Sequence, residues 1–196
     1  MDRRKEMEEY LKDYRTERLR IKKIYLENNL IKLESAFHEK LDILIAEQLQ
    51  RQKEDNAVKL KNIFLCRLIS SGYTESYETI LGMSSVMLYM DEKKSLVYWY
   101  PELVYENIVQ DMEAVEKLLR IKFLRLEDFE LFFLKQKLLY DDWTLLQECF
   151  RNLFKQAVSL IMDSPLRLEN EFLILSGDYM DNLKIIDHKV TERREE

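Results

Sequence analysis

The first third of the chain shows a helical pattern of apolar and polar positions. Residues 2–69 contain neither glycine nor proline and are rich in leucine, glutamate, lysine and arginine. Apolar residues recur every three or four positions, with a gap at Arg18 in the stripe over residues 7–24 and no gap over residues 26–44. This is the spacing of one face of an α-helix. The pattern predicts one very long helix, or two helices joined by a weak break, over residues 2–69.

Two places weaken the prediction of one unbroken helix. The apolar stripes before and after Asn28 and Asn29 are out of phase, which predicts a kink or a change of neighbour there. Residues 47–56 hold one large apolar side chain, so they form either a solvated helical turn or the hinge of a helical hairpin around residues 55–56. Residues 58–69 are again strongly apolar and predict a helix that ends at Gly72.

The middle of the chain predicts helices and one hairpin. Thr74 is a suitable cap for a helix that begins at residue 75. Two β-prone runs, residues 86–90 and 96–100, flank a charged tetrad and predict a β-hairpin. The competing interpretation is a helix that continues to about residue 90. Apolar spacings then predict a unit of three antiparallel helices, near residues 102–122, near residues 127–140, and from Asp141 or Asp142 to about residue 162.

The last part of the chain allows two interpretations. Residues 172–175 and 183–186 either pair as strands across Gly177, or residues 179–190 form a helix capped by Asp178, and we favour the helix. The chain has only 3 glycines and 2 prolines, which argues against an all-β fold because such folds need many turns. The predicted fold class is mainly α, with a long N-terminal helix or helical hairpin, a helical body and at most one small β-hairpin. The predicted domains are a coiled-coil-like arm, residues 1–71, and a mainly helical body, residues 72–196.

Charge is divided unevenly along the chain. Residues 1–67 carry 16 basic and 13 acidic side chains, a net of +3, whereas residues 68–196 carry 15 and 24, a net of −9. The acidic body disfavours nucleic acid as its ligand, because phosphates repel it. Cys66 and Cys149 lie in apolar surroundings and predict two buried, reduced thiols. No apolar run approaches the ~20 residues that span a bilayer, and residues 1–6 lack the apolar core of a signal peptide, so we expect a cytoplasmic protein without membrane contact.

Candidate chemistry is weak. Glu34, His38 and Asp42 fall four residues apart on one helical face, a spacing that can bind a divalent metal, but a solvated helix face explains them more simply. Asp141, Asp142 and Glu148 resemble a carboxylate cluster, but a helix N-cap explains the adjacent aspartates. No glycine-rich phosphate loop and no nucleophile motif occurs. We therefore expect a protein that is not an enzyme and has neither a cofactor nor a bound metal.

The leading functional hypothesis is an interaction or regulatory protein. A helix of nearly seventy residues would reach ~100 Å, whereas a compact domain of this chain length has a radius of gyration of roughly 16 Å. The segment must fold back on itself or meet a partner, either another protein or a second copy of the chain. Tyr98 and Trp99 add large aromatic side chains on opposite faces of a strand. The predicted partner-binding residues are Leu26, Leu30, Leu33, Phe37, Leu41, Leu44, Tyr98 and Trp99.

The alternative hypothesis concerns nucleic acid. Basic residues gather near the N-terminus and are interleaved with tyrosines, as in a segment that contacts phosphates. In a variant of this hypothesis, the acidic body inhibits a nucleic-acid enzyme by occupying a basic groove. The usual explanation of such mixed charges, which we prefer, is helix solubility and pairing along the helix. The residues of this alternative are Arg3, Arg4, Lys5, Arg15, Lys22 and Lys23.

Overall fold

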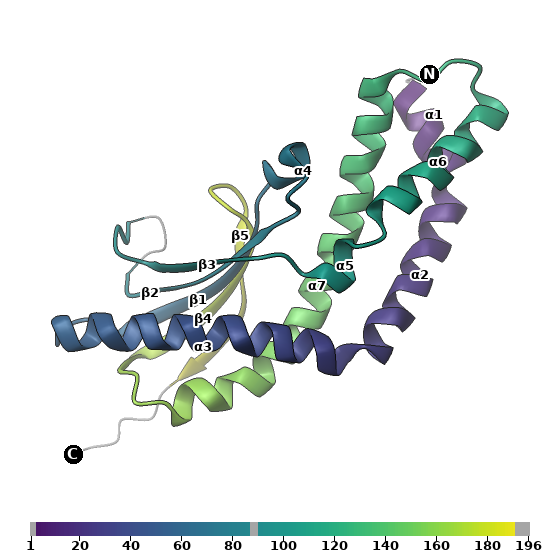
Figure 1. Cartoon of the computed structure of the whole chain (residues 1–196). Helices are drawn as coiled ribbons and strands as arrows, with labels where there is room; N and C mark the ends of the chain where they lie inside the picture. Colours follow the sequence, from purple (N-terminus) through teal and green to yellow (C-terminus); the bar gives the residue numbers. More distant parts are fainter. Residues whose placement is uncertain (1–2, 87–89, 191–196) are drawn as a thin grey trace. The chain divides into compact units, whose positions relative to one another are not determined.

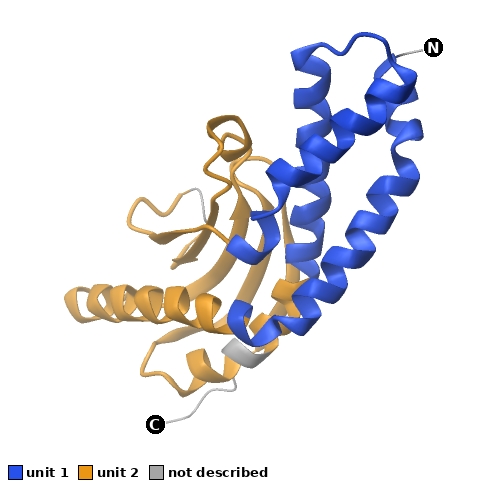
Figure 2. Ribbon diagram, turned by 45° about the vertical axis from the view of Figure 1, so that its right-hand side comes forward, with its two compact units in different colours: residues 1–33, 102–148 blue, residues 34–101, 149–196 orange. Residues whose placement is uncertain are grey.

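The computed structural model describes residues 3–86 and 90–190, and these divide into two compact units. Unit 1 comprises residues 1–33 and 102–148, and unit 2 comprises residues 34–101 and 149–196 (Figure 2). Each unit is thus assembled from two segments that are far apart in the sequence.

Unit 1 is helical. Two helices near the N-terminus pack with helices from the middle of the chain, and the residues of the first predicted stripe, Met7 and Leu11, are 1% exposed. From the middle of the chain, Val115 and Leu119 are fully buried. The helices of this unit are α1 (Arg3–Tyr10), α2 (Lys12–Asn28), α5 (Glu102–Tyr105), α6 (Ile108–Lys122) and the first part of α7 (Asp128–Asp163) (Figure 1).

The break expected around Asn28 and Asn29 is confirmed. Helix α2 ends at Asn28, and α3 (Leu30–Glu54) begins two residues later. The side chain of Asn29 donates a hydrogen bond to the carbonyl oxygen of Tyr25 at 2.9 Å, so it holds a backbone group at the end of α2. At the second weak place, α3 ends at Glu54, and the Asp55 carboxylate accepts a bond from the backbone N–H of Ala57.

Unit 2 is built on a five-stranded mixed sheet with the strand order β3-β2-β1-β4-β5. The central strand β1 is antiparallel to β2 and parallel to β4, and both outer strands are antiparallel to their neighbours. The bounds are β1 Leu60–Arg67, β2 Thr79–Ser84, β3 Ser95–Trp99, β4 Leu168–Asp178 and β5 Leu183–Val190, with the short helix α4 (Ser71–Thr74) between β1 and β2 (Figure 1).

The predicted fold class is wrong because of this sheet. The protein is 58% helical and 21% strand, and it has far more strand than one small hairpin. Residues 58–69, predicted as a helix, contain β1, in which both faces are buried. A strand of this kind is a short continuous apolar run, and periodicity cannot distinguish it from a buried helical segment. The helix expected from residue 75 is likewise replaced by β2, which is buried at every position.

Two further predictions are corrected near the strands. The run at residues 96–100 does contain a strand, but β3 pairs with β2 rather than with residues 86–90, of which 87–89 lie outside the described residues. At the end of the chain the strand alternative holds, because β4 and β5 pair across the turn after Gly177. The expected terminal helix is therefore wrong.

Helix α7 also differs from the prediction. It continues through Asp141 and Asp142 to Asp163 without the predicted interruption. Adjacent aspartates are typical of a helix start, but here they lie in the middle of the helix, and their side chains have partners on other helices. The two adjacent aspartates therefore mark a contact between helices and not the start of a helix.

Each face of the sheet has its own apolar packing. On one face, Phe37 of α3 contacts Trp99 of β3 and the rings of Phe150 and Phe154 of α7, with ring centroids 5.7–6.2 Å apart; Figure 1 shows α3 running along this face. On the other face, Phe64 and Cys66 of β1 pack with Ile80 and Leu175, because successive side chains of a strand point to opposite faces.

Candidate functional site

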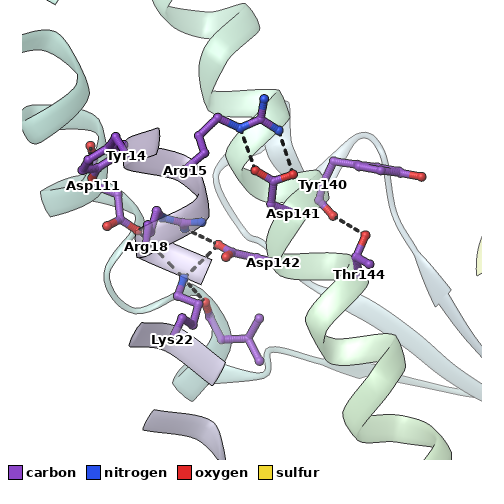
Figure 3. Close-up of polar contacts among 10 residues, drawn as sticks. Tyr14, Arg15, Arg18, Lys22, Asp111, Tyr140, Asp141, Asp142 and Thr144 are labelled. Atoms are coloured by element: carbon purple, nitrogen blue, oxygen red, sulfur yellow. Dashed lines mark hydrogen bonds and ion pairs between the residues drawn. The ribbon is translucent and has the colours of Figure 1, made fainter. Parts of the chain in front are cut away.

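A cluster of six charged side chains joins three helices of unit 1. Helix α2 contributes Arg15, Arg18 and Lys22, whose spacing places them along one side of the helix. Asp111 comes from α6, and Asp141 and Asp142 come from α7 (Figure 3). The cations and carboxylates are equal in number, so the cluster is neutral as a whole.

The contacts within the cluster are short and directional. Arg15 donates two hydrogen bonds to Asp141, both at 2.8 Å. Arg18 bridges two helices, because its Nε donates to Asp111 at 2.6 Å and its Nη2 to Asp142 at 2.7 Å. Lys22 Nζ donates to the same Asp142 oxygen at 2.9 Å and to a backbone carbonyl oxygen of α5 at 2.7 Å. Charge-assisted bonds of this kind are stronger than neutral ones.

The centre of the cluster is removed from water. Arg18 and Lys22 are 6% exposed and Asp142 is fully buried. Burying charges is expensive, and the pairs repay this cost only when the geometry is good. Within the described residues, Arg18 Nη1 and Asp142 Oδ1 are buried atoms that have no hydrogen-bond partner. Removal of one charged side chain from the cluster would therefore leave a buried charge without its partner.

Burial and pairing shift the acid–base equilibria of the cluster. Burial lowers the pKa of Lys22, and the positive charge of Arg18 acts in the same direction, against the opposing effects of Asp142 and Asp111. Burial raises the pKa of Asp141, although Arg15 opposes this rise. Burial also raises the pKa of the Tyr14 hydroxyl, helped by the carboxylate of Asp111. These directions follow from the higher cost of a charge away from water.

A pocket of about 510 Å³ lies beside the cluster, between α2 and α6. Arg18, Lys22 and Asp111 reach its wall, and Ile21 of α2, which is 56% exposed, provides apolar surface. The volume is within the range of ligand pockets, which combine apolar walls with a few polar groups. The remaining wall consists of two phenol rings, one carboxylate and two amides, from Tyr14, Tyr25, Glu17, Asn107 and Gln110.

The predicted partner-binding stripe lies inside the protein. Five of its six residues are at most 1% exposed, and Leu30 is partly buried. A partner could reach these side chains only by displacing residues that already pack against them. The two aromatic residues of β3 separate as a strand requires, with Trp99 2% and Tyr98 58% exposed. The buried residues of the stripe are Leu26, Leu33, Phe37, Leu41 and Leu44.

Most basic residues of the nucleic-acid alternative have partners within unit 1. Arg15 and Lys22 belong to the charge cluster. Arg3 forms an ion pair with Glu130 at 2.8 Å, and Lys23 lies 3.5 Å from Glu148. The Arg4 guanidinium lies 5.5 and 5.4 Å from the ring centroids of Phe129 and Phe133. These contacts occupy charges that a phosphate backbone would need, and Lys5 lines a separate pocket with acidic neighbours.

Two further groups of candidate residues are not brought together in the part of the chain that the structure describes. Within the described ranges, no three His, Cys, Asp or Glu side chains come together as metal ligands, so Glu34, His38 and Asp42 lie along α3 without converging. Glu148 pairs with Lys23 rather than joining Asp141 and Asp142.

The two cysteines differ in their surroundings. Neither forms a disulfide, and Cys66 is buried whereas Cys149 is only partly buried. Burial raises the pKa of Cys66 to about 12, which makes it a poor nucleophile at neutral pH.

Sequence reasoning missed the roles of Arg18, Asp111 and Asp142. A signal for one of them was present, because Arg18 interrupts an otherwise apolar stripe, and a charge at a core position usually has a buried partner. The partners themselves lie 93 and 124 residues away in the chain, a separation at which a single sequence carries no pairing information.

Comparisons with protein families, with curated proteins and with solved structures found no match to this chain. None of the described helices has a stretch that is both long enough and apolar enough to cross a membrane.

Proposed function

We propose that this protein is a non-enzymatic interaction protein that binds a segment of a partner protein in the pocket between α2 and α6. The observation that carries this proposal is the pocket of about 510 Å³ with exposed Ile21 in its wall. Exposed apolar surface beside polar groups is typical of protein interaction sites. The N-terminal helix α2 would bind the partner through its exposed side, which carries Ile21, because the apolar stripe is already buried.

The charges around the pocket support binding rather than catalysis. Arg18, Lys22 and Asp111 are engaged with each other and with Asp142, and a group in such a network is held in place rather than poised to transfer a proton. The role we assign to the cluster is to hold α2 and α6 at a constant separation. A pre-formed groove of this kind lowers the cost of ordering the site on binding.

A reducing compartment fits two cysteines that form no disulfide. Proteins that work in oxidising compartments commonly use their cysteines in disulfides, whereas no disulfide joins Cys66 and Cys149. The proposed place of action is therefore the cytoplasm.

Site-specific photocrosslinking tests the proposed function. A photoreactive phenylalanine analogue is placed at Ile21, which lines the pocket, and separately at Ile24, which is 44% exposed on the same helix but does not line it. In cells of the native host, we expect position 21 to capture one protein and position 24 to capture none. The purified partner should then bind the wild type and lose at least about tenfold in affinity with Ile21→Asp, since a carboxylate buried at an apolar contact is costly. Equal crosslinking from both positions, or unchanged affinity of the Ile21→Asp variant, would contradict the proposal.

A further inference from the structure

The edge strand β5 combines an unpaired backbone edge with exposed apolar side chains. β5 lies at the end of the sheet, so it pairs with β4 on one side, and no strand among the described residues lies along its other side. Ile185 and Val190 are 62% and 71% exposed. An edge of this kind presents N–H and C=O groups that can pair with another strand.

The register of β5 on β4 determines which charged side chains share a face. Lys184 pairs with Ser176, Asp187 with Ile174 and Lys189 with Phe172. Alternate residues of β4 point to the same face, so the side chains of Lys184, Asp187 and Lys189 all lie on one face of the sheet. Residues 184 and 187 can share a face because the register shifts between Leu175 and Ile174, which leaves one extra residue in β5.

This arrangement makes β5 complementary to itself. When two copies of the strand are aligned antiparallel with Leu183 opposite His188, Lys184 falls opposite Asp187. The two-fold symmetry of such a pair repeats the match, so each dimer gains two cross-strand ion pairs on one face. The alignment uses six residues of each strand. Lys189 lies 3.3 Å from Asp187 in the same strand, so each Asp187 carboxylate would lie between Lys189 and Lys184 of the second copy.

We propose that two copies of this protein associate through their β5 strands, which pair antiparallel and join the two five-stranded sheets into one. The occupant of the free edge is therefore a second copy of the chain. The inference is independent of the α2–α6 pocket, because it concerns residues of unit 2 alone. The free backbone edge of β5 provides the hydrogen bonds of the association, and the Lys184–Asp187 pair fixes the alignment of the two strands.

Charge exchange across the strand pair tests this inference. The full chain is studied by sedimentation equilibrium over a range of concentrations, and we expect the wild type to reach twice the mass of one chain. Lys184→Glu places two carboxylates opposite each other at both symmetric positions, and should raise the dimer dissociation constant about tenfold or more. The double exchange Lys184→Glu with Asp187→Lys restores opposite signs and should bring the constant back to within about threefold of the wild type.

Lys93→Glu is the matched control, because it makes the same charge change at an exposed residue just before β3, at the opposite edge of the same sheet. We expect it to leave the dissociation constant unchanged. A monomeric wild type at the highest soluble concentration overturns the inference. So does a dimer that resists Lys184→Glu, or one that responds to Lys93→Glu instead. Circular dichroism of each variant separates a lost interface from a lost fold, and failure to rescue by the double exchange in a folded protein also rejects the proposed register.

Discussion

Asp142 is the residue on which the buried cluster depends. One of its oxygen atoms accepts hydrogen bonds from both Arg18 and Lys22, and its side chain is fully buried. Asp111 is a second carboxylate near the same two cations. A neutral side chain at position 142 would therefore leave an excess positive charge in a place that water does not reach.

We expect Asp142→Asn to lower the free energy of unfolding by about 3–5 kcal/mol, the range observed when one partner of a buried ion pair is removed. Urea denaturation at neutral pH measures this change. Glu148→Gln is the control, because Glu148 pairs with Lys23 and both side chains are more than half exposed; its expected effect is at most about 1 kcal/mol. Similar losses in the two variants would show that the cluster contributes no more than a surface pair.

The pKa of Asp141 gives a prediction about pH. Burial raises this pKa above its ordinary value of 3.8, and Arg15 opposes the rise. At this carboxyl, the folded protein therefore holds a proton to a greater extent than the unfolded chain just above pH 3.8. The contribution of Asp141 favours folding at lower pH and is lost as the pH rises through the folded pKa.

We expect Arg15→Gln to raise the pKa of Asp141 further. The loss of its contribution to folding should then occur at a higher pH. Carboxyl carbon shifts in an NMR titration report the change. Arg20→Gln, which removes a cation paired with exposed Glu17, should leave the titration of Asp141 as it is. An unchanged Asp141 titration in the Arg15→Gln protein would mean that this pair does not form in solution.

At the scale of elements, the sheet depends on close approaches at two glycines. A Cβ atom at Gly82 of β2 would lie 2.3 Å from the ring of Phe64 and 2.8 Å from a methyl carbon of Leu96. A Cβ atom at Gly177 of β4 would lie 1.9 Å from the backbone oxygen of Asn182, in the turn that leads to β5. A smaller side chain at position 64 can remove the first clash, whereas no side-chain substitution removes the second, which is with the backbone.

We expect Gly82→Ala to lower the free energy of unfolding by about 1–3 kcal/mol through overpacking. The same substitution in a Phe64→Leu background should cost less, because the shorter side chain leaves room for the new methyl group. The cost of Gly177→Ala in free energy of unfolding should be the same with and without Phe64→Leu. Chemical denaturation of the single and double variants gives the coupling energies; a zero coupling at Gly82 would contradict the described contact.

At the scale of the molecule, the charge cluster belongs to one unit and the sheet to the other. Loss of the cluster removes ties between α2, α6 and α7, whereas the hydrogen bonds between β1 and its neighbours in unit 2 are untouched. Parts of a protein that are stabilised by separate contacts can open separately.

Amide hydrogen exchange followed by mass spectrometry tests this separation. We expect Asp142→Asn to speed exchange in α6 by about tenfold or more, which corresponds to a loss of at least ~1.4 kcal/mol in local stability, and to leave β1 close to its wild-type rate. Equal acceleration in α6 and β1 would show that the two units unfold as one cooperative body.

Local spacing along the chain was enough to predict the N-terminal helices, whose periodicity is sustained. The spacing of apolar residues predicted helical structure over α1, α2 and α3, and the phase change at Asn28 and Asn29 predicted their break. These features depend on neighbours three or four residues apart, which a single sequence records directly. The sequence also showed the gap at Arg18 in the apolar stripe, but it did not indicate which carboxylates pair with Arg18.

The sheet and the charge cluster depend on contacts between segments that are far apart in the chain. β1 and β2 read as helices because a short apolar run suits either structure, and their pairing with each other, with β3 and with β4 decided the outcome. Asp142 read as a helix cap, and its actual partners lie more than a hundred residues away. In both cases the deciding free energy comes from groups that meet only after the chain has folded, so no local pattern in the sequence could specify it.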